Sequence, residues 1–148
     1  MGYGHLAEEL SLSQAITITA GASGSTAING TILDMAGYDG VLVEVQFGAI
    51  TAGAATSIKM QQDISSTMGG ATDLEGTSQT IADDDDDKLF YIDLKRPKEQ
   101  YVRLVVSRAT QASTCAATYK RYRGRNKPSV HGSNVAGEKW VSPAEGTA

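Results

Sequence analysis

The groups in this sequence that could do chemistry are two histidines, one cysteine and several clusters of charge. His5 and His131 lie in irregular segments at opposite ends of the chain, far from any nucleophile or ligand pattern. The sequence has no CxxC, HExxH, nucleophile-elbow or strand-linked GxGxxG motif. We therefore predict that the protein is not an enzyme and has no catalytic residue, metal site or cofactor.

The single cysteine, Cys115, lies within a pattern typical of a β-strand and cannot form an internal disulfide. A buried structural thiol is the expectation there, and it points to synthesis in a reducing cytoplasm. No apolar run approaches the ~18 residues that a membrane-spanning helix needs, and no signal peptide opens the chain. We expect no contact with a membrane.

The run of aspartates from 83 to 87 is the strongest acidic feature. Clustered carboxylates are the hard oxygen ligands that calcium prefers. Consecutive residues of an extended chain point in opposite directions, so a solvated loop, or a patch that binds a basic partner, is favoured over a calcium site. The predicted partner-binding residues here are Asp83, Asp84, Asp85 and Asp86.

A basic cluster follows the last predicted strand, with Tyr119 and Tyr122 interleaved; its members are Lys120, Arg121, Arg123, Arg125 and Lys127. Lysine and arginine neutralise phosphates and tyrosines stack on bases, so nucleic acid is one candidate ligand. An acidic protein surface is favoured over it, including the aspartate loop of a neighbouring copy.

The charges are distributed unevenly along the sequence. Up to Leu94 there are fourteen acidic residues against Lys59 and Lys88, and from Lys95 onward there are eleven basic residues against three acidic ones. The whole chain of 148 residues has a net charge of −4. This polarity favours contact between copies, as a dimer or trimer, or contact with a partner of mixed sign.

The elements that must position these groups are predicted to be β-strands, because apolar and polar residues alternate along most of the chain. The segment 88–106, KLFYIDLKRPKEQYVRLVV, shows this best and is interpreted as a hairpin near the centre of the fold. Further strands are expected at 14–20, 27–35, 41–47, 56–63, 74–81 and 114–122. About eight strands without a long helix predict an all-β, antiparallel β-sandwich, with a jelly roll as first choice.

The predicted sandwich spans 14–122, with irregular arms at 1–13 and 123–148. The C-terminal arm is rich in Gly, Ser, Pro and Asn and carries Val130 and the pair Trp140 and Val141 as apolar anchors. A solvated tail rarely carries Trp. We expect the arm, Trp140 above all, to dock on a partner or on another copy.

The segments GYDGVLVEVQFGAIT and DDKLFYIDLKRPKEQYVRLVV resemble small β-sandwich proteins encoded in the head-gene modules of tailed bacteriophages, and the resemblance covers about 38–122. The most distinctive part is the pattern KxxYIDLKRPxxxYVRLVV. Those proteins look like capsid decoration, or cement, proteins.

The resemblance implies a structural virion protein made in the host cytoplasm. It would bind the outer surface of the capsid and stabilise it by bridging major capsid protein subunits. A tail, neck or fibre component of the virion is the alternative, and a nucleic-acid-binding β-barrel module is the second alternative.

Overall fold

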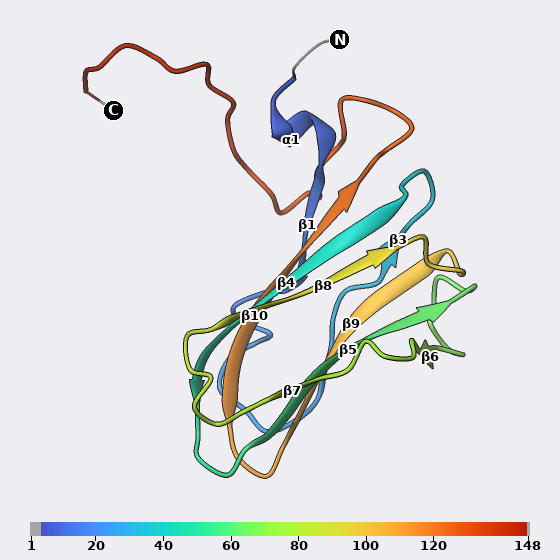
Figure 1. The fold of residues 1–148 in the computed structure, drawn as a ribbon, viewed down its shortest axis with the longest axis vertical. Helices are drawn as coiled ribbons and strands as arrows, with labels where there is room; N and C mark the ends of the chain where they lie inside the picture. Colours follow the sequence, from blue (N-terminus) through green and yellow to red (C-terminus); the bar gives the residue numbers. More distant parts are fainter. Residues whose placement is uncertain (1–3, 148) are drawn as a thin grey trace.

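The computed structural model describes residues 4–147, and nearly all of its regular structure is β-strand, arranged in two antiparallel sheets (Figure 1). One short helix, α1 (Leu6–Glu9), precedes the strands. The strands are β1 (Ser11–Ile16), β2 (Ile28–Asn29), β3 (Leu33–Asp34), β4 (Gly40–Ile50), β5 (Ala55–Asp63), β6 (Thr72–Asp73), β7 (Gln79–Ile81), β8 (Leu89–Lys95), β9 (Tyr101–Ala109) and β10 (Ser113–Tyr122). The predicted all-β sandwich is confirmed.

The order of the strands is that of a jelly roll. One sheet has the order β1-β10-β4-β8, and the other has the order β2-β9-β5-β6, with β3 also paired to β9 and β7 also paired to β5. β2 and β3 together occupy one edge position, and β6 and β7 together occupy the other. Successive long strands therefore alternate between the sheets, as in double-sheet jelly rolls.

The core lies between the sheets and is built from the inward faces of the long strands. Val41, Val43, Val45 and Phe47 of β4 are at most 1% exposed, as predicted for this face. From the opposite sheet, the fully buried apolar side chains include Ile58, Met60, Val102, Leu104 and Val106. Because side chains alternate along a strand, these positions account for the period of two in the sequence.

The predicted hairpin at 88–106 is wrong. β8 pairs with β4 in one sheet, whereas β9 pairs with β5 in the other, and residues 96–100 cross between the layers. Alternation identifies a half-buried strand, but it does not specify the sheet that the strand joins. The inward faces were predicted correctly, because Ile92, Val102 and Leu104 are buried.

The strand boundaries differ from the prediction mainly near the N-terminus. β1 begins at Ser11, inside the segment expected to be an arm, and it ends at Ile16 rather than continuing to 20. The strand expected at 27–35 is split into β2 and β3, because Gly30 still donates to Leu104 O while the next amide, that of Thr31, donates to Ala15 O of β1. Among residues 4–147 no helix is long and apolar enough to cross a membrane.

Candidate interaction surfaces

The predicted basic cluster divides into side chains that stabilise the fold and side chains that face solvent. Lys120 forms an ion pair with Glu44 at 2.5 Å. Arg121 donates to Asp34 O at 2.6 Å and to Ser11 Oγ at 2.8 Å, and its guanidinium lies 4.3 Å from the centre of the Tyr38 ring. These two residues join neighbouring elements of the same chain, so they are poor candidates for binding a partner.

Arg123 and Arg125 are exposed and lie at one end of the sandwich. The backbone of Arg125 donates to Gly37 O, and the backbone of Arg96, on the connection between β8 and β9, donates to Asp39 O in the same turn. Exposed Arg96 and Lys98 add to the positive charge at this end. We call the group Arg96, Lys98, Arg123 and Arg125 the basic end.

The aspartate run forms the connection from β7 to β8, and its carboxylates bond to the protein backbone. Asp83 accepts from Gly53 N and Asp86 accepts from Ile50 N, both at 2.6 Å, and Asp85 accepts from Ala82 N at 2.9 Å. The first two bonds fasten this loop to the end of β4 and to the connection that follows it. The sequence did not indicate this structural role.

Asp85 also accepts from Lys88 Nζ at 2.5 Å. This hydrogen bond is the main reason that the pKa of Asp85 lies below its usual value and the pKa of Lys88 lies above its own. Asp83, Asp84, Asp86 and Asp87 are exposed. Within residues 4–147 no group of three or more His, Cys, Asp or Glu side chains is placed to hold a metal ion.

Most of the C-terminal arm lies against the N-terminal segment of its own chain. Ser129 N donates to Glu8 O and Gly132 N donates to Leu12 O, both at 2.8 Å. In return, Leu12 N donates to His131 Nδ1 at 3.0 Å, and Ser11 Oγ donates to Val130 O at 2.6 Å. The arm therefore covers the edge of β1 that does not pair with β10.

Ion pairs extend this contact on both sides. Lys139 Nζ lies 2.6 Å from Glu8 Oε1, and Lys127 pairs with Glu9. The hydrogen bond from Lys139 is the largest cause of the lowered pKa of Glu8. Lys127, predicted to bind a partner, thus contacts its own chain in this structure.

Beyond Lys139 the arm leads away from the sandwich (Figure 1). Trp140 is 67% exposed and Val141 is 83% exposed. All three apolar anchors that the sequence indicated are exposed, since Val130 is 77% exposed as well. Trp140 and Val141 differ from Val130 in that they follow the part of the arm that contacts the N-terminal segment.

The contact between the arm and β1 predicts the effect of removing the His131 side chain. In His131→Ala, Leu12 N–H loses its acceptor, and a lost hydrogen bond of about 1 kcal/mol should speed hydrogen exchange at Leu12 by about fivefold. His5→Ala is the control, because that side chain makes no bond to β1 in the described structure. Equal exchange at Leu12 in the two variants would contradict this role of His131.

Two polar side chains connect elements across the core: Arg108, which the sequence analysis did not single out, and Tyr119, which it grouped with the tyrosines able to stack on bases but which is 0% exposed. Arg108 is 7% exposed and donates to the carbonyl oxygens of Ala22, Thr26 and Ser113, each at 2.8 Å. The Tyr119 hydroxyl donates to Thr31 O and accepts from Leu104 N. The alternation along the strands could have indicated that both side chains point inward. Arg108 lies on the same face of β9 as Leu104, and Tyr119 lies on the same face of β10 as Cys115.

No protein-family model matches this chain, and no curated protein matches it. Among solved structures, the chain is similar to one described as "Crystal structure of PirA", with 16% sequence identity and a TM-score of 0.38. The match covers 82% of this chain and 100% of that one. A similarity at this level supports no inference about function.

Proposed function

We propose that this protein is a structural component of a tailed-phage virion that binds the outer surface of the capsid and bridges neighbouring major capsid protein subunits. The observation that carries the proposal is the form of the C-terminal arm. Its first part is fastened to β1 by backbone hydrogen bonds, and its last part presents Trp140 and Val141 to solvent. The resemblance of the central segments to decoration proteins supplies the identity of the partner.

An arm of this form suits attachment to a lattice. The fastened part limits the conformational freedom of the segment that follows it, so less entropy is lost when that segment binds. A Trp side chain buries a large area on docking and is typical of binding hot spots. Many copies on one capsid surface give a stable layer even when each contact is modest.

The proposed contact between the end of the arm and the capsid is tested by deleting residues 140–148. This deletion removes Trp140 and Val141 and keeps the preceding part of the arm on β1. Loss of a Trp hot spot costs about 2 kcal/mol or more, so binding to purified capsids should weaken about thirtyfold. Co-sedimentation of the protein with empty capsids measures this, with Trp140→Ala as the point variant. Val130→Ala is the control, because Val130 is also an exposed apolar residue of the arm, at 77%.

Undiminished retention of the shortened chain would refute the role of this segment. Deletion of the whole arm from 123 is a poorer test, since it would also uncover the edge of β1. Loss of binding in that variant would not distinguish a lost contact from a damaged fold.

A further inference from the structure

β8 is an edge strand whose second side has no pairing strand among residues 4–147. Phe47 N donates to Lys88 O across the pair formed by β4 and β8. Because backbone groups of alternate residues point to opposite sides of a strand, those of Phe90, Ile92 and Leu94 face β4. The backbone groups of Leu89, Tyr91, Asp93 and Lys95 face outward, and the Gln79 side chain indeed reaches Tyr91 O from that side at 2.9 Å.

The two edge strands of this sheet, β1 and β8, differ in how their outer sides are covered. The outer edge of β1 is covered by the C-terminal arm, through Gly132 and His131. Within the described residues, the one hydrogen bond to the outward-facing backbone of β8 comes from the Gln79 side chain. An open edge of this length is a template for another strand.

The side chains of β8 are incompletely covered on both faces. On the outer face, Leu89 is 59% exposed and Tyr91 is 66% exposed. On the inner face, Phe90 and Leu94 are half-buried against the core, although they flank fully packed Ile92. A strand placed beside β8 would bury apolar surface on both faces.

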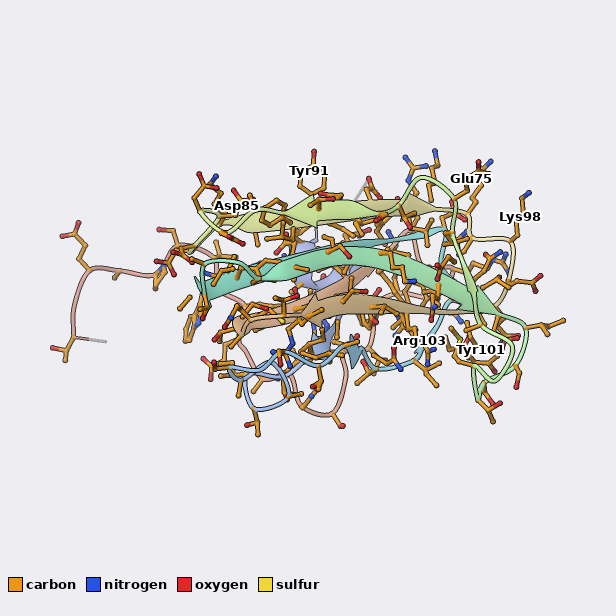
Figure 2. The ribbon with its side chains drawn as sticks, turned by 90° about the horizontal axis from the view of Figure 1, so that it is seen from below. Glu75, Asp85, Tyr91, Lys98, Tyr101 and Arg103 are labelled. Atoms are coloured by element: carbon orange, nitrogen blue, oxygen red, sulfur yellow. The ribbon has the colours of Figure 1, made fainter. Side chains whose placement is uncertain are left out.

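The two ends of β8 carry opposite charge. Its N-terminal end follows the five aspartates at 83–87, and its C-terminal end leads through Lys95 and Arg96 to Lys98. Figure 2 shows Asp85 and Lys98 near opposite ends of the sandwich, with Tyr91 between them and directed outward. Each end also has one residue of the other sign: Lys88 directly follows the aspartates, and Glu99 directly follows Lys98.

We propose that two copies of this chain associate through β8, in antiparallel pairing about a two-fold axis at Ile92. An antiparallel pair of identical strands brings the acidic end of each copy to the basic end of the other, twice per dimer. In this register Phe90 faces Leu94 of the second copy and Ile92 faces its equivalent. The two four-stranded sheets would become one continuous sheet, and the Gln79 side chain would give up Tyr91 O to the incoming backbone.

This register is the one that pairs the whole of β8 with itself. Its outward-facing residues then lie opposite each other, Leu89 with Lys95 and Tyr91 with Asp93, as the hydrogen-bonded pairs of an antiparallel ladder require. The two Tyr91 rings become diagonal neighbours, within reach of each other.

Sedimentation velocity of the full chain, over a series of protein concentrations, measures the association without any capsid. A monomer–dimer equilibrium is expected. Tyr91→Pro should raise its Kd at least about tenfold, because proline removes an outward-facing N–H while sparing the bonds to β4. Tyr91→Val, which keeps the N–H, is the matched control and should retain the larger part of the association.

A charge exchange tests the orientation of the two copies and does not depend on the proline variant folding. Lys98→Glu and Asp84→Lys should each raise the dimer Kd by about three- to tenfold at low salt. The double variant places opposite charges together again and should restore the Kd. A double variant weaker than either single variant would refute the antiparallel arrangement.

The register is tested by disulfide formation in mixed proteins. Facing residues of a hydrogen-bonded pair have Cα atoms about 5.5 Å apart, within the range of a disulfide. A mixture of Tyr91→Cys and Asp93→Cys proteins should therefore cross-link faster than either protein alone, and Cys115 is buried and will not compete. Fastest cross-linking of Tyr91→Cys with itself would refute the register.

A strictly monomeric or trimeric wild-type protein would overturn the proposal, as would a dimer that tolerates Tyr91→Pro in the folded state. These outcomes concern the protein alone. They are therefore independent of whether the C-terminal arm binds a capsid.

Discussion

Leu104→Asp is expected to abolish cooperative folding. Leu104 is fully buried on β9, and its amide donates to the Tyr119 hydroxyl between the sheets. The substitution removes a large apolar side chain and buries a carboxylate without a partner, at a combined cost of more than about 5 kcal/mol. Because whole domains are stable by only about 5–15 kcal/mol, thermal unfolding followed by circular dichroism should show no native transition.

Ile18→Asp provides the control for this variant. It introduces the same side chain in place of an aliphatic one, but Ile18 is 80% exposed. Its unfolding midpoint should remain close to that of the wild-type protein. A folded Leu104→Asp protein would mean that the inward face of β9 is assigned incorrectly.

Gly21→Ala should be the most damaging small substitution in the chain. A Cβ atom at Gly21 would lie 1.6 Å from Cys115 O, a distance that no side-chain adjustment can relieve because the neighbour is backbone. The loop would have to move, which breaks the 2.9 Å bond from Cys115 N to Gly21 O and disturbs the bond from Arg108 to Ala22 O. Overpacking together with a lost buried hydrogen bond costs about 3 kcal/mol, or about 10 °C in Tm.

Gly48→Ala is the control that distinguishes the steric clash at Gly21 from any general effect of replacing glycine by alanine. A Cβ atom there would meet Thr114 at 3.6 Å, which is ordinary van der Waals contact. Gly48→Ala should therefore change Tm by no more than a few degrees. Similar losses in the two variants would show that the contact between the 17–24 loop and β10 contributes little to stability.

The alternation of apolar and polar residues made it possible to predict the strands and their inward faces. It did not make it possible to predict which strands pair with each other. Val45, Ile58 and Met60 could be assigned to the core because polar residues flank each of them. Nothing in that pattern distinguishes a hairpin from a crossover, so β8 and β9 were wrongly placed side by side. The five-residue connection at 96–100 carries no tight-turn signature such as Asn-Gly, and that was the available warning.

The sequence shows where charged residues gather, but it does not show which of those side chains are used within the fold. Lys120 and Arg121 are neighbours in sequence and point to opposite faces of β10, so one reaches Glu44 and the other reaches Ser11 and Asp34. Asp83 and Asp86 accept from Gly53 N and Ile50 N, which lie 30 and 36 residues earlier in the chain. Contacts between distant segments determine which charges remain available to a partner, and local sequence does not record them.

The contact between Gly132 and Leu12 also has a consequence for the order in which the protein can mature. A ribosome releases β1 well before the segment that covers it, because Leu12 and His131 lie 119 residues apart in the sequence. The outer edge of β1 therefore stays open until that segment has been made. The contact also closes a long loop in the sequence, which makes it a late event in folding as well. Truncated translation products would keep an uncovered strand edge and should be the species most prone to aggregate.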